Sequence, residues 1–155
     1  MKLIIKYVLV FIAIIILAIG VFYAVQYFRW RKSIDYLALE YAKHLENQYK
    51  NDAYGGFTPE ETLRLFIEAL KNDDVELAAK YFVIEKQDER QRTLTNWSNL
   101  NKLSTIIATL EKAGNGKEIF PGNYELSVAN KNNEAEFIID LRKNEFTEKW
   151  KLEDF

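Results

Sequence analysis

Residues 3–28 read LIIKYVLVFIAIIILAIGVFYAVQYF, and this stretch decides how the rest of the chain is organised. From Tyr7 to Phe28 it holds no charged residue and consists mostly of Ile, Leu, Val, Phe and Ala. As an α-helix this part is about 33 Å long, enough to cross a hydrocarbon core of about 30 Å. A helix in the core of a water-soluble domain would show a polar face, and this run shows none. We therefore predict a membrane-spanning helix, which makes the lipid bilayer the first partner of the chain.

Basic residues flank the apolar run at both ends: Lys2, Lys6, Arg29, Arg31 and Lys32. A cleaved signal peptide is the alternative, with a weak cleavage pattern at residues 18–20, but its apolar region would span only about 7–15 residues. We predict an uncleaved signal anchor. The flanking charges are nearly tied, and the very short N-terminal tail favours a cytoplasmic N-terminus with the domain outside a bacterial cytoplasmic membrane.

Beyond residue 32 the chain is acidic, because it holds all 23 acidic residues but only 16 of the 21 basic ones, a net charge of −7. Such a charge repels phosphate backbones and argues against nucleic acid as a partner. The chain contains no cysteine. Disulfides, thiolate metal sites and a cysteine nucleophile are therefore excluded.

Residues 33–50, SIDYLALEYAKHLENQYK, carry apolar side chains at spacings of three and four, as on one face of an α-helix. No Gly or Pro separates this segment from the membrane run, so we predict one continuous helix over residues 3–50. The apolar stripe either packs on the folded domain of the same chain or forms a homodimer. The dimer contact would use Leu37, Tyr41 and Leu45.

Residues 51–57, NDAYGGF, interrupt the helical pattern, and the pair Gly55-Gly56 predicts a hinge before a domain over residues 58–155. Thr58-Pro59-Glu60-Glu61 is a typical helix start, with an N-cap, a proline at the first position and a capping box. Three helices are predicted: one that ends near residue 71, a short one from residue 74, and a long one over residues 85–112. Gly114 and Gly116 would then cap the third helix and turn the chain.

From Lys117 onward the apolar period changes from about 3.6 to 2. Strands are predicted at residues 119–120, 124–128, 135–141 and 146–152, with turns at 130–133 and 143–145. Helices followed by strands indicate an α+β fold. The predicted protein is an N-terminal transmembrane helix followed by a small domain of three helices packed on an antiparallel curved sheet.

The segment TPEETLRLFIEALKNDDVELAAKYF resembles the opening of nuclear-transport-factor-2-like (cystatin-like cone) domains of uncharacterised bacterial membrane-anchored proteins. The ending AEFIIDLRKNEFTEKWKLEDF resembles the closing hairpin of these domains. The resemblance covers residues 58–155. It implies a cone-shaped pocket between the helices and the concave face of the sheet.

The candidate ligand-binding residues are aromatic side chains of this predicted pocket: Phe66, Tyr81, Phe82, Trp97, Tyr124, Phe137 and Trp150. Aromatic side chains bind apolar ligands, and they equally form the core of a small domain. Both uses remain open at this stage. The ligand would be an apolar small molecule or a protein partner in the bacterial envelope.

No catalytic residue, cofactor or metal site is predicted. Enzymes of the fold that the chain resembles place an Asp, His or Tyr in the pocket, but the single histidine, His44, lies in the segment before the domain. Asp140 falls on the polar side of its predicted strand. We therefore predict a membrane-anchored, non-catalytic binding module. A structural subunit of a membrane assembly, joined through residues 33–50, and a pocket acid–base enzyme are the two alternatives.

Overall fold

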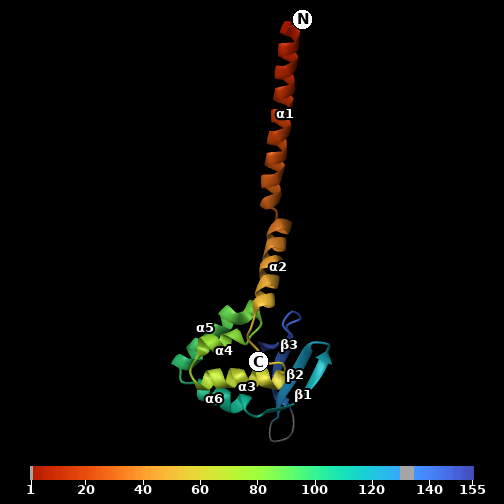
Figure 1. Ribbon diagram of the computed structural model, residues 1–155. Helices are drawn as coiled ribbons and strands as arrows, with labels where there is room; N and C mark the ends of the chain where they lie inside the picture. Colours follow the sequence, from red (N-terminus) through yellow and green to blue (C-terminus); the bar gives the residue numbers. More distant parts are fainter. Residues whose placement is uncertain (1, 130–134) are drawn as a thin grey trace. The chain divides into compact units, whose positions relative to one another are not determined.

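The computed structural model describes residues 2–129 and 135–155 (Figure 1). The chain divides into two compact units between Leu45 and Glu46. The first unit holds helix α1 (Lys2–Arg31) and most of helix α2 (Ile34–Asn51). The second unit holds the last turn of α2 and everything after it.

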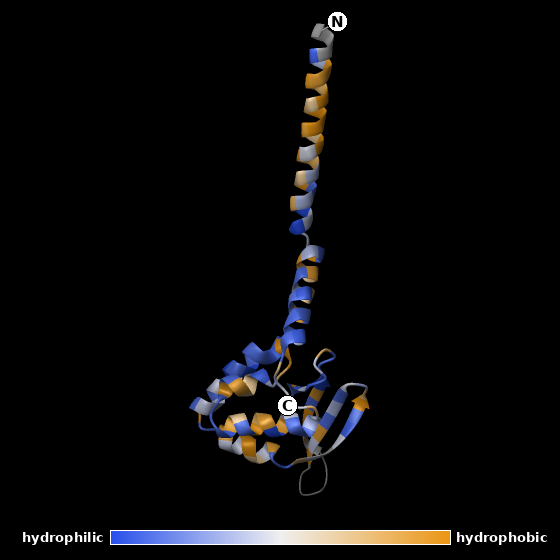
Figure 2. Ribbon diagram, in the orientation of Figure 1, coloured by the Kyte–Doolittle hydropathy of each residue, from blue (hydrophilic) through white to orange (hydrophobic). Residues whose placement is uncertain are grey.

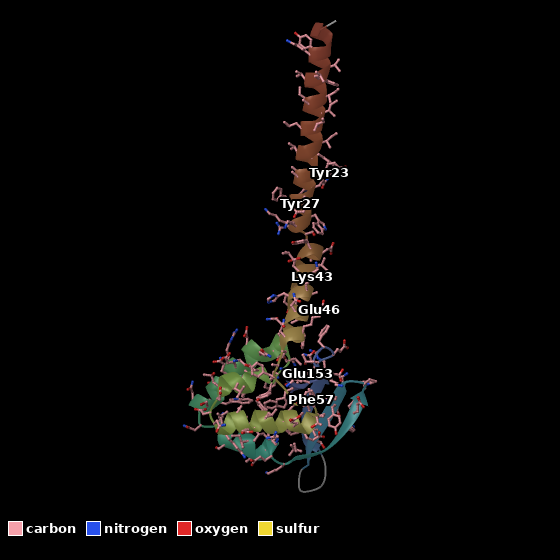
Figure 3. The ribbon with its side chains drawn as sticks, in the orientation of Figure 1. Tyr23, Tyr27, Lys43, Glu46, Phe57 and Glu153 are labelled. Atoms are coloured by element: carbon pink, nitrogen blue, oxygen red, sulfur yellow. The ribbon has the colours of Figure 1, made fainter. Side chains whose placement is uncertain are left out.

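Helix α1 contains the membrane-spanning candidate, Lys6–Arg31, which includes an 18-residue window with a mean hydropathy of 3.1 (Figure 2). Among the described residues it is the one helix whose length and composition suit a bilayer, a criterion that a secretory signal sequence also meets. Tyr23 and Tyr27 lie near the C-terminal end of α1 (Figure 3), where an interfacial aromatic belt is expected.

The prediction of one continuous helix over residues 3–50 is wrong, because the helical pattern stops at Lys32-Ser33. Ser33 starts α2: its Oγ accepts a hydrogen bond from the Tyr36 amide at 3.2 Å, as an N-cap residue does. The Ser33 amide donates to the carbonyl of Trp30 at 2.8 Å and closes α1. A serine hydroxyl satisfies backbone groups that a continuing helix would otherwise pair, so a helix can end without Gly or Pro.

The second unit begins, after the end of α2, with α3 (Pro59–Lys71) and α4 (Val75–Lys80). A short 3₁₀ turn (Ile84–Lys86), α5 (Gln87–Asn99) and α6 (Leu103–Leu110) follow. The strands β1 (Ala113–Phe120), β2 (Asn123–Ala129), β3 (Ala135–Lys143) and β4 (Trp150–Asp154) complete it. They form one antiparallel sheet in the order β1-β2-β3-β4, so the predicted α+β class is confirmed.

The start of α3 shows the predicted N-cap, and the Glu61 side chain bonds to the amide before the N-cap residue rather than to the Thr58 amide that a capping box uses. Thr58 Oγ1 accepts a hydrogen bond from the Glu61 amide at 3.1 Å, and Glu61 Oε2 accepts one from the Phe57 amide at 2.7 Å. Both bonds satisfy amides that the helix itself leaves unpaired. The helix ends at Lys71 with Asn72 as its C-cap, and the positive φ of 55° at Asp73 lets the amides of Asp73 and Asp74 bond back to the carbonyls of Leu70 and Ala69.

The predicted long helix over residues 85–112 is also wrong, because it is divided into α5 and α6. Asn101 has a φ of 54°, and its amide donates to the Ser98 carbonyl at 2.9 Å. The next amide, from Lys102, donates to the Trp97 carbonyl at 2.8 Å. This is the Schellman pattern that ends helices, and asparagine is the residue that tolerates it best after glycine.

The strands start elsewhere than predicted at two points. β1 begins at Ala113, so Gly114 and Gly116 lie inside a strand and do not cap a helix. β4 begins at Trp150, because residues 144–149 form a tight loop in which Glu148 has a φ of 61°. The predicted turn at 130–133 lies outside the described residues.

Residues 52–57, which fall in the predicted hinge, are bonded closely to the second unit. The ammonium of Lys151 lies 2.6 Å from Asp52 Oδ2 and also donates to the carbonyls of Tyr54 and Lys80. Lys151 is fully buried, and this burial lowers the pKa of its ammonium despite the opposing effect of Asp52. Bending at this segment would break these bonds.

The two glycines of the segment allow close packing of the backbone rather than hinge flexibility. Gly55 has a φ of 113°, and a Cβ there would collide with the carbonyl oxygen of Trp150. A Cβ at Gly56 would lie 2.6 Å from that of Glu61. The carbonyl of Gly56 accepts from the Trp150 amide at 2.8 Å, so the segment extends the hydrogen bonding of β4.

Candidate functional site

The seven aromatic residues predicted to line a pocket are divided between the core and the surface. Phe66 and Phe82 are fully buried and meet edge to face, with ring centres 5.4 Å apart. Tyr81 and Trp150 are buried as well. These four side chains belong to the hydrophobic core of the second unit, together with Leu63, Leu70, Leu94, Leu126, Ile139, Leu141 and Leu152.

Tyr124 lies at the edge of this core, where its ring meets that of Trp150 edge to face, with ring centres 5.8 Å apart. Its ring covers Gly116 on the neighbouring strand, and its hydroxyl donates to Glu60 Oε1 at 3.1 Å. Burial is the main cause that raises the pKa of this phenol, and the hydrogen bond to Glu60 adds to it. Tyr124 therefore links β2 to the first turn of α3.

Trp97 and Phe137 are the two predicted residues that line an open recess. The recess has a volume of about 330 Å³ and is bounded by α5, α6, β3 and the last residue of the chain. Its lining is Trp97, Thr105, Ile106, Thr109, Leu110, Phe137 and Phe155. We refer to it as the aromatic recess.

Phe155 is the residue of the aromatic recess that the sequence analysis missed. Its ring centre lies 5.9 Å from that of Phe137, 6.2 Å from that of Trp97 and 5.6 Å from that of Phe66. It therefore joins the recess to the core. The alternation of β4 ends one residue earlier, so the strand pattern alone did not indicate a packed side chain at position 155.

Arg90, on α5, contacts Phe155 and the core residue Phe82 and so helps to hold both rings in place. Its guanidinium lies 5.2 Å from the ring centre of Phe82 and 5.7 Å from that of Phe155, and it forms an ion pair with Asp154. Burial alone would raise the pKa of Asp154. The Phe155 amide and Arg90 outweigh burial and hold this pKa below its usual range. Stacking on both rings fixes their positions under the recess.

The polar groups of the aromatic recess are few. Thr105 and Thr109 line it, and the hydroxyl of Thr109 donates to the Thr105 carbonyl at 3.1 Å, within α6. No ionisable side chain is part of its lining in the described chain. The recess therefore suits an apolar group, held by contact area rather than by charge.

A second hollow, the α3–β1 cleft, has a volume of about 500 Å³. Its apolar floor consists of Leu63, Ile67, Leu110 and Leu126, and its β1 wall consists of Ala113, Gly114 and Gly116. Charged side chains surround it: Glu60, Arg64, Glu68, Lys71 and Glu111. None of the seven predicted pocket residues lines this cleft.

The two ionisable residues weighed in the sequence analysis lie apart from both hollows. His44 is exposed on α2, in the first unit. Asp140 lies on β3, where burial and then the carboxylates of Glu125, Asp154 and Glu153 raise its pKa. Among the residues that the structure describes, no group of three His, Cys, Asp or Glu side chains is placed to hold a metal ion.

Comparison of the chain with known protein families, with curated proteins and with solved structures finds no match in any of the three.

Proposed function

We propose that this chain is a single-pass membrane-anchored binding module without catalytic activity, displayed on the outer face of a bacterial cytoplasmic membrane. The aromatic recess is the proposed binding site, and an apolar group of an envelope protein or of a small molecule is the proposed ligand. Membership of the nuclear-transport-factor-2-like class is part of the proposal. The anchor would keep the module close to ligands in or near the bilayer.

The geometry of the aromatic recess is the observation on which this proposal rests. The recess is open, and its lining combines three partly exposed aromatic rings with aliphatic side chains from α6. Its volume of about 330 Å³ falls within the range of small-ligand sites, about 300–1,000 Å³. Its threonine hydroxyls do not ionise near neutral pH, which favours binding over acid–base catalysis.

A fluorescent apolar probe, anilinonaphthalene sulfonate, tests the recess with the full chain held in lipid nanodiscs. We expect saturable binding above that of empty nanodiscs, and loss of this component in Ile106→Trp, which fills the recess. Leu100→Trp adds the same side chain at an exposed position between α5 and α6, outside the lining, and serves as the control. Equal binding by both variants and the native chain would refute the recess as the site.

The orientation is tested separately with single cysteines, since the native chain has none. Gln91→Cys places a thiol on an exposed part of α5. We expect a membrane-impermeant maleimide to label this variant in intact spheroplasts as fully as after lysis. Labelling only after lysis would place the domain inside and would leave the recess experiment unaffected.

A further inference from the structure

The two edges of the sheet differ in how their backbone groups are used. At the β4 edge, the Leu152 amide donates to the Tyr81 carbonyl and the Val83 amide donates to the Leu152 carbonyl, each at 2.9 Å. Gly56 covers the same edge next to Trp150. At the opposite edge lies β1 (Figure 1), which pairs with β2 alone among the described residues. A free edge presents unpaired N–H and C=O groups to an added strand.

The α3–β1 cleft lies along this free edge. Three of its lining residues belong to β1, and the floor is formed by leucines and an isoleucine from α3, α6 and β2. A side chain added at Gly114 would meet nothing within 4 Å, so the wall is open at that point. A strand paired with β1 would place every second side chain over the face that carries α3, and hence over the cleft.

The form of β1 sets where such a strand would pair. Asn115 and Gly116 lie opposite the single residue Leu126, which is a bulge, and a second irregularity follows between Glu118 and Phe120, so the regularly paired stretch between the two is Lys117–Glu118. Bulges and an edge lysine are devices that keep sheets from pairing indiscriminately. They restrict pairing to a short segment, so the side chains that enter the cleft must supply much of the affinity.

The charges around the cleft favour a basic residue on the added strand. Arg64 pairs with Glu68, and Lys71 pairs with Glu111 at 2.5 Å. Glu60 is the remaining carboxylate of the lining, and it accepts a hydrogen bond from the neutral hydroxyl of Tyr124. A cation over Glu60 would complete the charge balance of the cleft.

We propose that the β1 edge and the α3–β1 cleft form a docking site for an extended segment of a partner protein. The segment carries aliphatic side chains at alternate positions and one basic residue that pairs with Glu60. It adds a fifth strand to the sheet through β1 and buries its aliphatic side chains against Leu63 and Ile67. This site shares the side chain of Leu110 with the aromatic recess, and its proposed occupant does not depend on the recess.

Short synthetic peptides in which Val alternates with Thr, with one terminal Lys, test the proposal against the full chain in nanodiscs. We expect binding and slower hydrogen exchange of β1 amides. N-methylation of alternate peptide nitrogens keeps the side chains but removes strand pairing, and we expect it to abolish binding. Equal binding of methylated and unmethylated peptides, or no binding up to about 1 mM, would overturn the proposal.

Variants of the chain separate the two parts of the site. Gly114→Trp fills the cleft and should weaken binding at least about tenfold, the loss expected when one aliphatic side chain is no longer buried. Gln91→Trp on α5 is the matched control and should bind normally. Glu60→Gln should weaken the Lys-bearing peptide about two- to fivefold and leave a Lys-free peptide unchanged. If Gly114→Trp binds as tightly as the control, the cleft is not the site.

A second copy of the chain is the competing occupant. Glu118→Cys places a thiol on β1, and rapid disulfide formation between two copies in one nanodisc would show that the edge is already occupied and would overturn the proposal. Binding of the apolar probe to the aromatic recess should remain unchanged in Gly114→Trp. That measurement distinguishes failure at β1 from failure of the proposed recess function.

Discussion

Two connections in this chain, Lys32-Ser33 and residues 52–57, differ from each other, and each has the structure that its composition would not predict. Lys32-Ser33 contains neither Gly nor Pro, yet the helical pattern ends there and starts again. Residues 52–57 contain Gly55-Gly56, yet they are held by Lys151, which pairs with Asp52 and donates to the Tyr54 carbonyl, and by the edge of β4. The difference shows that a glycine pair serves close packing as readily as motion. A capping serine is enough to interrupt a helix.

The largest effect is expected at the buried ion pair that holds residues 52–57. Lys151→Met leaves the carboxylate of Asp52 buried without a cation, and should lower the free energy of unfolding of the second unit by about 3–5 kcal/mol. Urea unfolding of the full chain in mild detergent, followed by near-ultraviolet circular dichroism, measures it. Exposed Lys112→Met is the control, and Asp52→Leu added to Lys151→Met should recover most of the loss. A loss below about 1 kcal/mol would show that the segment is held elsewhere.

Gly55→Ala tests whether the glycine pair serves packing. The positive φ and the collision with Trp150 should together cost roughly 2–4 kcal/mol in the same assay. Gly114→Ala is the matched control, because its Cβ would enter open space and should change stability little. If Gly55→Ala were instead as stable as the native chain, residues 52–57 would have the freedom that a hinge needs.

Tyr49, in the last turn of α2 before residues 52–57, gives the second unit a pH-dependent stability. Burial, followed by the hydrogen bond from its hydroxyl to Glu85, raises the pKa of Tyr49 to about 12. The folded chain therefore keeps the phenol protonated where an unfolded chain, with a tyrosine pKa of about 10, loses the proton. The stabilisation is fully present below pH of about 10 and is lost as the pH rises from about 10 to 12.

Tyr49→Phe tests this dependence. The variant should lose about 1–2 kcal/mol at neutral pH, because Glu85 and Arg142 each lose a hydrogen-bond partner. It should then show a shallower fall in stability above pH of about 10 than the native chain. Parallel curves for the two proteins across that range would contradict the assignment.

The smallest effect is expected at the other connection. Ser33→Ala removes the hydroxyl that caps α2 and should cost that helix about 0.5–1 kcal/mol. Hydrogen exchange of the amides of residues 34–37 should increase, whereas urea unfolding of the second unit should remain unchanged. Slower exchange in the variant would mean that α1 and α2 had joined into one helix, and that Ser33 alone interrupts them.

Much of the fold could be predicted from local patterns. The apolar run of α1, the capped start of α3 and the alternation of β2 and β3 each depend on neighbouring residues, whose spacing in the sequence carries the information. The division between α5 and α6 could not, because Asn101 is only one of several polar residues that permit a left-handed turn. Its choice depends on packing of Leu94 and Leu103 into the same core.

The candidate sites were less predictable than the fold. Aromatic identity suggested seven pocket residues, but the sequence does not tell a ring that fills the core from one that lines an opening. Phe66 and Phe82 are covered, whereas Trp97 and Phe137 are partly open, and only their neighbours decide between the two outcomes. The α3–β1 cleft was missed because Gly114 and Gly116 were interpreted as a helix cap.

By itself the sequence determined an apolar helix long enough to span a membrane, an acidic domain, the α+β class and the absence of any disulfide. These properties follow from composition, charge and short-range periodicity. The tertiary structure alone decided the ends of the helices, the bonding of residues 52–57 to Lys151, and which edge and which recess stay open. Those features arise between residues far apart in the chain, such as Asp52 with Lys151 or Trp97 with Phe155, and no local pattern encodes their meeting.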